Sequence, residues 1–455
     1  MERAYRRRPS AESRAVWTDQ FKAQRLLFRQ KATDYWSSAI ADNLSDPRRL
    51  WQKINRVIKP PTTTQIPHSA DDLASHFAGK VNKIRASTAS SADQRVIRSR
   101  SSETGLSSFH PVTAEDACRL ISRAPCKHCD LDPAPTWLIK RAAGVLAPVV
   151  AAICNASLQS GVFPDSQKRA LVRARLKKPS LNPDDLNSYR PISNLTFLSK
   201  ILERVVARQF MDHADQNGLL PARQSAYRKF HSTESAVLVV HNDIVCAIDQ
   251  GHVVARVLLD LSYAFDTVDH PTMLSLLHDR FAVSDEPLSW FHSYLSNRTQ
   301  TFTTSSTQTS PLLLHSGVPQ GSGLGPTSFL TYTEGTADIF SAHSLFYHLY
   351  ADDTQTYGHC STSDIPGLIS RLTFCISDLA ESYSALRLQL NPSKTEFIWF
   401  GTRCNLNKVP HEHFSLSVAS SIVQSSAVVR DLGILLDSEL SMKHHISKVT
   451  STCNP

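Results

Sequence analysis

Glycine, long apolar runs and regularly spaced cysteines are all scarce in this sequence. Only 15 of its 455 residues are glycine, about half the usual share of roughly 7%, which excludes a collagen-like or glycine-rich architecture. The longest apolar run covers residues 142–154. A transmembrane helix needs about 20 residues, so neither a membrane span nor a membrane partner is expected. The nine cysteines are odd in number and irregularly spaced, which argues against a secreted disulfide framework and favours a reducing compartment.

Positive charge is concentrated at the N-terminal end. The chain has 49 basic and 41 acidic residues, a net charge of +8. Residues 1–60 hold 14 basic and 6 acidic residues, so the whole excess lies there and the remaining 395 residues balance at 35 of each. A basic segment on a neutral body predicts a polyanionic partner, nucleic acid first; a solvated helical face with surplus arginine is the alternative. The overall composition, 41% apolar and 20% charged, is globular, and the length suggests about three domains.

Local patterns predict a helical N-terminal part. Apolar residues spaced through 15–58 indicate a helix, which the prolines at 60–61 would end. Ser and Asp at 69–72, and Thr and Asp at 113–116, have the spacing of helix capping boxes. Residues 86–109 include eight serines and few apolar residues, which is typical of a flexible linker.

Two strand signals further along the chain end in carboxylates. The apolar run 253–259 is followed at once by Asp260, and β-prone stretches flank Asp352 and Asp353, which predicts a hairpin with this pair at its tip. A carboxylate at the end of a buried strand is costly unless it is compensated. Three such carboxylates on adjacent strands could hold two Mg²⁺ ions, with Asp352 bridging and Asp353 secondary because neighbouring strand residues point to opposite faces. Taken alone, an Asp-Asp pair in a turn is ordinary turn chemistry.

Eight segments give these carboxylates a context. In chain order they are LNSYRPISNLTFLSKILERVV (186–206), ARQSAYRKFHSTESA (222–236), RVLLDLSYAFDTVDH (256–270), WFHSYLSNRTQ (290–300), SGVPQGSGLGP (316–326), LYADDTQTY (349–357), LQLNPSKTEFIWFGT (388–402) and RDLGILLDSELSMKHHISKV (430–449). Together they resemble the reverse transcriptases of non-LTR (LINE-type) retrotransposons, within the jockey and chicken-repeat branch. The resemblance begins at about residue 111 and is specific because all eight segments occur in register.

The resemblance implies roles for residues at the reaction centre. Asp260, Asp352 and Asp353 match the metal-binding catalytic carboxylates. Lys394 matches the lysine that protonates the leaving pyrophosphate. Phe265 matches the bulky ring that screens the sugar, so that deoxynucleotides are preferred.

Other residues are implied to hold the substrates. Gln320 and Gly321 match positions that line the incoming nucleotide and the template, and Leu432 and Gly433 resemble the primer grip. Three basic residues are candidates for gripping the triphosphate, with the choice among them open: Arg190, Lys200 and Arg228.

The fold implied by the resemblance is α/β (α+β), a right-hand polymerase. The expected organisation is a basic helical connector with the serine-rich linker (1–110), a helical pre-finger extension (111–165), fingers (166–245), palm (246–436) and the start of a thumb (437–455). Members of the family usually carry an endonuclease ahead of the polymerase. Here the endonuclease region and most of the thumb are expected to be lacking.

The activity implied by the resemblance is RNA-directed DNA synthesis. A primer 3′-hydroxyl would attack the α-phosphate of a dNTP with two Mg²⁺ ions, or Mn²⁺ as an alternative. The partners would be an RNA template, a DNA primer and dNTPs, and the family context is target-primed reverse transcription in the nucleus, with a cytoplasmic phase. The sequence leaves the oligomeric state open.

Two other functions fit part of the pattern. The expected loss of the thumb motivates a catalytically inactive retroelement relic that only binds nucleic acid. A two-metal nuclease would need the same carboxylates. The loop around Gln320 and the ring of Phe265 are needed only for nucleotide selection, which favours the polymerase.

Overall fold

The computed structural model describes residues 10–42, 66–92, 104–127, 129–419 and 421–453. The chain divides into two units, Met1–Gln65 and Ile66–Pro455, and each is considered by itself. Of the first unit the structure describes α2 (Ala11–Ala41), which overlaps the predicted helix at 15–58. The rest of that prediction, from residue 43 on, lies outside the described residues. Large apolar side chains along α2, including Phe21 and Leu26, are exposed.

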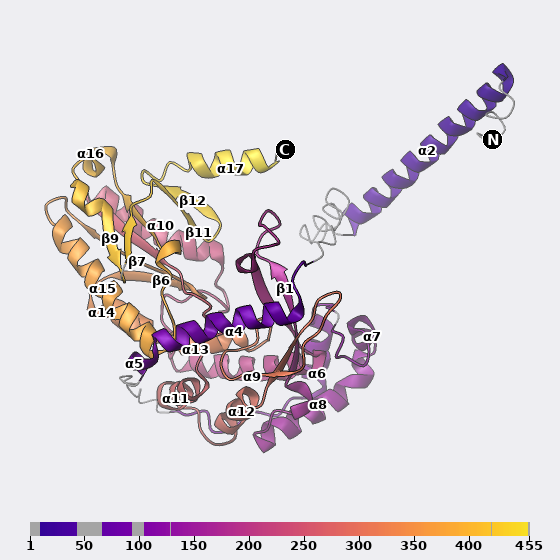
Figure 1. Ribbon diagram of the computed structural model, residues 1–455, viewed down its shortest axis with the longest axis horizontal. Helices are drawn as coiled ribbons and strands as arrows, with labels where there is room; N and C mark the ends of the chain where they lie inside the picture. Colours follow the sequence, from indigo (N-terminus) through magenta and orange to yellow (C-terminus); the bar gives the residue numbers. More distant parts are fainter. Residues whose placement is uncertain (1–9, 43–65, 93–103, 128, 420, 454–455) are drawn as a thin grey trace. The chain divides into compact units, whose positions relative to one another are not determined.

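Two four-stranded sheets organise the described part of the second unit (Figure 1). We call them the β1 sheet, with strand order β2-β1-β4-β5, and the β3 sheet, with order β6-β7-β3-β8. Two separate hairpins, β9–β10 and β11–β12, accompany them. The strands are β1 Arg169–Leu176, β2 Tyr189–Asn194, β3 Val253–Leu259, β4 Thr299–Phe302, β5 Leu312–Leu313, β6 Phe346–Tyr350, β7 Asp353–Cys360, β8 Glu396–Phe400, β9 Ser415–Val418, β10 Ser421–Gln424, β11 Val428–Asp431 and β12 Ile434–Asp437.

Helices are mixed with these sheets, which confirms the α+β prediction at that level. They are α4 Ala70–Ser87, α5 Ala89–Ala92, α6 Ala114–Arg123, α7 Thr136–Arg141, α8 Ala143–Ser160, α9 Phe197–Gln216, α10 Thr233–Asp249, α11 His270–Phe281, α12 Asp285–Leu295, α13 Gly325–Tyr332, α14 Thr336–Ala342, α15 Ile365–Ala385, α16 Arg403–Leu406 and α17 Lys443–Cys453. Short 3₁₀ helices lie at η1 Asp165–Gln167, η2 Leu186–Ser188, η3 Pro392–Lys394 and η4 His411–Phe414. Both predicted capping boxes are confirmed, because Ser69 and Thr113 each accept a hydrogen bond from the backbone of the Asp three residues later.

The strand β3 has the predicted bounds, and it is buried on both faces. Successive side chains of a strand point to opposite sides. The odd-numbered residues of β3 join the large core cluster, whereas Val254 joins a second cluster with residues of α10, β8 and the β11–β12 hairpin. This double burial accounts for the nearly continuous apolar run. Arg256 is the exception, and alternation assigns it to the face of Val254.

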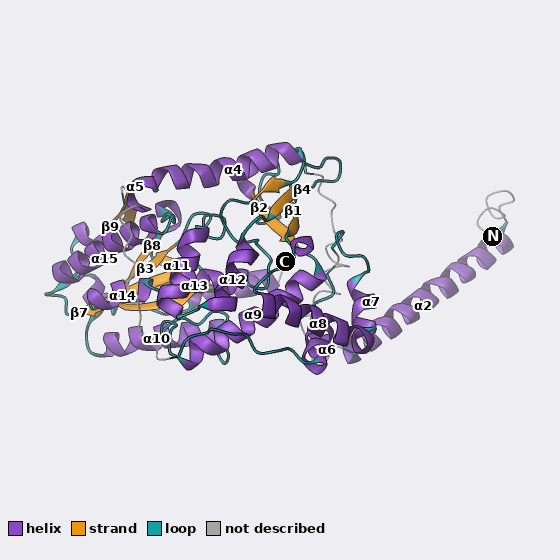
Figure 2. Cartoon of the chain, turned by 90° about the horizontal axis from the view of Figure 1, so that it is seen from below, coloured by secondary structure: helices purple, strands orange, loops and turns teal. Residues whose placement is uncertain are grey.

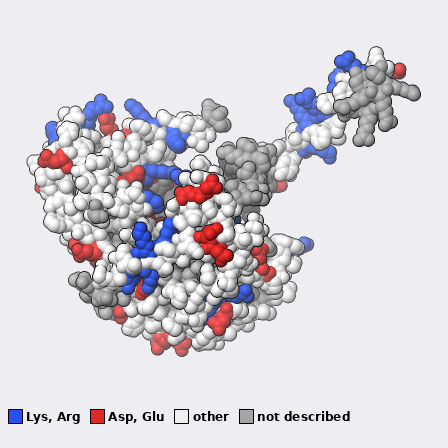
Figure 3. Space-filling view, viewed as in Figure 1, with Lys and Arg blue, Asp and Glu red and all other residues white. Residues whose placement is uncertain are grey.

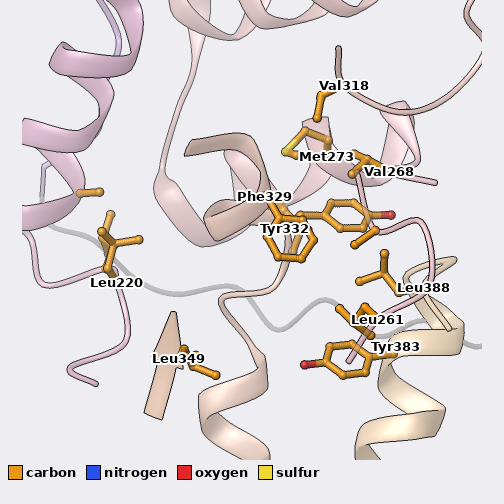
Figure 4. Close-up of a cluster of buried hydrophobic side chains, with 14 of the residues drawn as sticks. Leu220, Leu261, Val268, Met273, Val318, Phe329, Tyr332, Leu349, Tyr383 and Leu388 are labelled. Atoms are coloured by element: carbon orange, nitrogen blue, oxygen red, sulfur yellow. The ribbon is translucent and has the colours of Figure 1, made fainter. Parts of the chain in front are cut away.

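The large core cluster fixes the segment that follows β3. Figure 4 shows side chains of this cluster that come from β6, α11, α13 and α15, together with Leu261 and Val268 of the segment itself. The hydroxyl of Tyr332 accepts a hydrogen bond from the backbone amide of Asp269 at 3.1 Å and donates one to the carbonyl of Leu386 at 2.7 Å. Residues 261–269 are therefore held by packing and by hydrogen bonds, and this rigidity extends to the strand end at residue 259.

The helix α4 joins the β1 sheet to this segment. Its buried residues Leu73 and Phe77 belong to a cluster with Tyr189 and Phe302 of the β1 sheet. Near its other end, the guanidinium of Arg85 pairs with the carboxylate of Asp269 at 3.0 Å. Figure 2 shows α4 running from the β1 sheet to α5. One helix thus contacts both regions that flank the candidate site.

The segment predicted as a flexible linker, 86–109, is partly ordered. The helix α4 continues to Ser87 and α5 covers Ala89–Ala92; the alanines in this stretch are good helix formers, and they offset its serines. Residues 93–103 lie outside the described residues. Beyond them, the backbone of Leu106 bonds to Ala282 and Ser284 at 2.9 and 3.0 Å. The prediction was therefore wrong for 86–92 and around residue 106.

The helix α8 bears on the expectation that no segment spans a membrane. By length and composition alone its 18 residues could cross a bilayer, because the helix continues beyond the apolar run that ends at residue 154. One face of α8, with Ala147, Cys154 and Leu158, is buried in the large core cluster, which is also what a core helix shows.

Candidate active site

The three carboxylates singled out in the sequence come together at one end of the β3 sheet. β3 and β7 are antiparallel, with Leu259 opposite Thr354. Asp260 follows β3 directly and Asp353 precedes Thr354, so the same register places these two residues opposite each other. Asp352 lies in the turn between β6 and β7. The predicted hairpin is confirmed, with Asp353 as the first residue of β7 rather than part of the turn.

The carboxylates act on one another electrostatically. Loss of solvent is the largest cause that raises the pKa of Asp352, and the charge of Asp260 raises it further. For Asp353, desolvation followed by the charges of Asp352, Asp260 and Asp431 raises the pKa to about 6. No basic side chain among the described residues forms an ion pair with Asp352 or Asp353. This corner therefore concentrates negative charge, which Lys394 offsets only in part.

Lys394 reaches the first of these carboxylates. Its Nζ lies 2.9 Å from Oδ2 of Asp260. The turn that carries it is anchored by the backbone amide of Asn391, which donates to the carbonyl of Asp260 at 2.8 Å. The side chain of Lys394 is 60% exposed, so its charge faces solvent as well as Asp260. The lysine and the carboxylate that the sequence grouped by resemblance are direct neighbours.

The donor chemistry of this corner fits divalent metal ions. Hard cations such as Mg²⁺ and Mn²⁺ take carboxylate oxygens as ligands, and a cation would remove the repulsion that raises the pKa of Asp352 and Asp353. Within the described ranges, no three His, Cys, Asp or Glu side chains already stand at metal-binding spacing. One oxygen of Asp260 is also taken by Lys394. The donors and charges suit metal ions, and side chains would have to adjust to ligate them.

The residues predicted as the primer grip border the same corner. Leu432 and Gly433 form the turn between β11 and β12, with φ of +43° and +98°. Two consecutive positive φ values are typical of a type I′ hairpin turn. Leu432 lines a pocket of about 110 Å³ together with Asp260, Asp353 and Lys394. Asp352 is not among the residues that line this pocket.

A buried ion pair, which the sequence reasoning missed, holds that hairpin against the sheet. The guanidinium of Arg256, with no exposed side-chain surface, bonds to the carboxylate of Asp431, which is 3% exposed. Arg256 also donates to the side chain of Gln355 on β7. The signal was present, because an arginine within a buried apolar strand requires a partner charge.

Phe265 lies in the segment after β3, and the loop that carries Gln320 is bonded to that segment. The backbone amide of Val318 donates to the carbonyl of Phe265 at 2.9 Å. The ring of Phe265 stacks on Phe329 of α13 with centroids 5.0 Å apart. The amide of Gln320 donates to Asp266 Oδ2 at 2.8 Å, and burial raises the pKa of Asp266 to about 7. Phe265 is half-buried, so it contributes to packing and still presents surface.

Gly321 marks a close approach between two parts of the chain. Its φ is +111°, and a Cβ at this position would lie 2.9 Å from the carbonyl oxygen of Ser193 on β2. The backbone amide of Ser193 donates to the carbonyl of Gln320 at 2.9 Å. Any side chain at residue 321 would therefore push the Gln320 loop away from the β1 sheet.

The three candidates for gripping a triphosphate lie in different surroundings. Arg190, on β2, is exposed. Its charge lowers the pKa of Lys177, which the charge of Lys394 also lowers and that of Asp260 raises. Lys200, on α9, lines a separate pocket with Lys127 and Asp132, and burial lowers its pKa. Arg228 pairs with Asp215 at 3.1 Å and donates to two backbone carbonyls. Among the three, only Arg190 is a charge that shifts the pKa of Lys177, which the charge of Asp260 shifts as well.

Lys177 itself is a residue that the sequence reasoning missed. It follows β1 directly, and its backbone amide donates to Ser188 at 2.8 Å across the β1–β2 hairpin. Burial is the largest cause that lowers the pKa of Lys177, followed by the charges of Lys394 and Arg190. The sequence did contain one signal for Lys177, because this lysine directly follows a strand in which buried and exposed residues alternate. Which active-site groups it would face depends on how the β1 and β3 sheets meet, and the sequence does not contain that information.

Comparisons with known proteins cover most of these residues. The sequence profile of a family described as reverse transcriptase (RNA-dependent DNA polymerase) matches residues 176–428. The chain is 26% identical to the "Probable RNA-directed DNA polymerase from transposon BS" of Drosophila melanogaster, over 97% of this chain and 50% of that protein. It is 25% identical to the "RNA-directed DNA polymerase from mobile element jockey" of Drosophila funebris, over 74% of this chain and 36% of that protein. The chain thus spans half or less of the length of these relatives.

Proposed function

Because this chain belongs to the reverse transcriptase (RNA-dependent DNA polymerase) family, we propose that it copies an RNA template into DNA from a primer 3′-hydroxyl. The observation that carries the proposal is the corner formed by Asp260, Asp352 and Asp353. Desolvation and neighbouring negative charges raise the pKa of Asp352 and Asp353, and neither of these two forms an ion pair among the described residues. Lys394 lies against it at 2.9 Å from Asp260. This arrangement suits a reaction in which cations and a polyphosphate enter together.

The reaction joins the primer oxygen to the α-phosphorus of the dNTP and breaks the bond to pyrophosphate. Two divalent ions, Mg²⁺ or Mn²⁺, would lower the pKa of the primer hydroxyl and neutralise the leaving pyrophosphate. Asp260, Asp352 and Asp353 would hold these ions. Lys394 would give the pyrophosphate its proton, a role supported by its solvent-facing ammonium beside Asp260.

Nucleotide selection is assigned to the segment after β3 and the loop against it. Phe265 would screen the sugar, because a ring held by stacking on Phe329 leaves no room for a 2′-hydroxyl. Gln320 would line the nucleotide and the template, and its hydrogen bond to Asp266 fixes its side chain. Gly321 would keep this loop against β2.

The triphosphate would be held by Arg190, with Lys177 beside it. Both are exposed, and the charges of Arg190 and of Asp260 both act on the ammonium of Lys177. Arg228 is the weaker candidate because its guanidinium already pairs with Asp215, and Lys200 lies in another pocket. In this proposal the β1 sheet forms part of the fingers, the β3 sheet is the palm, and Leu432 with Gly433 positions the primer.

Primer extension tests the proposal directly. The purified chain should extend oligo(dT) on poly(rA) with dTTP and Mg²⁺, and EDTA should stop the reaction. The variant Asp352→Ala should be inactive yet bind RNA like the wild type, because the substitution leaves the basic residues of 1–60 unchanged. The matched control is Asp249→Ala, which removes an exposed carboxylate at the end of α10.

The alternatives give different results in the same assay. Primer shortening without extension would identify a metal-dependent nuclease. RNA binding without extension, from a chain with a cooperative unfolding transition, would identify a relic that only binds nucleic acid. Either result would overturn the polymerase proposal.

A further inference from the structure

One basic residue beside the candidate active site comes from outside the region that matches the family. Lys80 lies on α4, whereas the match begins at residue 176. Its Nζ donates to Oδ1 of Asn187 at 2.7 Å and to the hydroxyl of Tyr263, and it lies 4.7 Å from the centre of the Tyr263 ring. Tyr263 belongs to the segment between Asp260 and Phe265. The helix α4 thus places the ammonium group of Lys80 beside the segment that follows Asp260.

Lys80 continues the series of cations described above. Burial is the largest cause that lowers its pKa, and the charge of Lys177 is the next. The charges of Lys394 and Arg190 in turn lower the pKa of Lys177. Figure 3 shows Lys and Arg side chains over α4 and along the hollow beside it. Among the described residues, no carboxylate forms an ion pair with Lys80, Lys177 or Arg190.

The carboxylate of Asp185 compensates these charges only in part, because the pKa values of Lys80 and Lys177 stay lowered. Asp185 attracts both lysines, but its Oδ1 accepts hydrogen bonds from the backbone and side-chain nitrogens of Asn187 at 2.8 and 2.9 Å. An ammonium has three N–H donors, and Lys80 uses two of them on neutral acceptors. One donor of Lys80 therefore remains for an anion, and an anion bound between Lys80 and Lys177 would reduce the repulsion that Asp185 leaves between them.

We propose that Lys80 is an additional cation for the triphosphate of the incoming nucleotide, supplied by a helix upstream of the polymerase region. The inference rests on the proposed function. It selects the triphosphate rather than template phosphates because Lys177 donates to the carbonyl of the same Asn187 at 2.9 Å, and because Tyr263 belongs to the segment that follows Asp260, where the nucleotide would react. Since α4 also packs on the β1 sheet and pairs with Asp269, binding of the triphosphate would draw both sheets onto this helix.

The test compares Lys80→Met with Lys83→Met. Both changes remove one charge from α4, and Lys83 is exposed without a hydrogen bond to the site. In poly(rA)/oligo(dT) extension, Lys80→Met should raise KM for dTTP and the inhibition constant of inorganic tripolyphosphate about tenfold, with kcat within about threefold. Lys83→Met should leave all three near wild type. Lys80→Arg should recover most of the effect because it keeps a cation at this place.

Two results would overturn the inference. If Lys80→Met lowers only the unfolding midpoint or kcat, with KM and the tripolyphosphate constant unchanged, Lys80 is a latch between α4, Asn187 and Tyr263. If primer–template affinity falls about tenfold while KM is unchanged, the cation binds template phosphates instead.

A binding measurement separates this inference from the proposed function. Tripolyphosphate with Mg²⁺ should raise the unfolding midpoint of the wild type more than that of Lys80→Met, whether or not the chain extends primers. If the wild type extends no primer, the proposed function fails while this difference still supports an anion site at Lys80. If the midpoints shift equally, the site is absent.

Discussion

Two groups of carboxylates near the end of the β3 sheet have opposite surroundings. Asp431 is buried and paired with Arg256, which bonds to Gln355 as well. Asp352 and Asp353, in contrast, face no basic partner among the described residues, and their pKa values are raised. A charge that the protein neutralises itself holds structure together, whereas one that it leaves uncompensated is available to a ligand. The comparison therefore predicts that Asp431 contributes to stability, and it supports the proposed role of Asp352 and Asp353.

The largest effect is expected from Asp260, which lies beside the uncompensated pair and is paired with Lys394. Asp260→Asn should reduce single-turnover dTMP incorporation at least about 10⁴-fold, or about 5.5 kcal/mol of transition-state stabilisation, because a metal ligand and the partner of Lys394 are lost together. The free energy of unfolding should stay near wild type. Asp249→Asn is the control, since that carboxylate is exposed. Incorporation within tenfold of wild type would remove Asp260 from the reaction centre.

The compensated pair should show the reverse pattern. Arg256→Met leaves the carboxylate of Asp431 buried without a partner, which typically costs about 3–5 kcal/mol of stability, measured by urea unfolding. Adding Asp431→Leu should recover much of this loss. Arg403→Met breaks an ion pair whose arginine is 80% exposed, so it should cost less than about 1 kcal/mol. Equal losses for the two arginine variants would show that burial of the pair has no special energetic role.

A buried imidazole should remain neutral where burial outweighs the charge of a neighbouring carboxylate, as it does at His348 beside Asp431. His348 of β6 is 2% exposed, lies 3.0 Å from the hydroxyl of Ser225, and burial lowers its pKa to about 4. The unfolded chain binds a proton near pH 6.5, so stability should be lost as the pH falls from about 6.5 to about 4, by up to roughly 3 kcal/mol. Unfolding titrations of His348→Gln should lack this component. An unchanged acid dependence in the variant would assign it to other groups.

Much of this organisation was predictable from the sequence. The bounds of β3 follow from an apolar run, and the β6–β7 hairpin follows from two β-prone stretches around a turn. The meeting of Lys394 with Asp260 followed from the family resemblance rather than from any local pattern.

Long-range pairing explains most of what was not predicted. The β1 sheet takes β4 and β5 from residues 299–313, inside the segment predicted as palm, through a parallel pairing of β1 with β4. Lys80 bonds to Tyr263 because α4 packs across that sheet, and the place of Lys177 depends on how the β1 and β3 sheets meet. Arg256 could be recognised as an anomaly in an apolar strand, but its partner lies 175 residues away along the chain. Such contacts depend on tertiary packing, which local sequence patterns do not encode.

The smallest expected effect concerns selectivity beside the uncompensated carboxylates. Phe265→Val should lower the preference for dTTP over UTP about tenfold, or about 1.4 kcal/mol, because the ring that would meet a 2′-hydroxyl is removed. The ratio of kcat/KM values measures it. Phe374→Val is the control, since that ring is 62% exposed on α15. An unchanged ratio would place the sugar screen elsewhere.

The central claim, that the uncompensated carboxylates serve the reaction and the paired one serves stability, is tested most directly by neutralising one carboxylate of each kind in the same experiment. Asp352→Asn and Asp431→Asn each remove one charge, and each is assayed for dTMP incorporation per folded molecule and for its unfolding midpoint. The account predicts that Asp352→Asn loses incorporation and keeps or raises its midpoint, because repulsion with Asp260 is relieved. Asp431→Asn should lower the midpoint and retain incorporation within about tenfold of wild type. The opposite pattern, an active Asp352→Asn and an inactive but stable Asp431→Asn, would contradict the account.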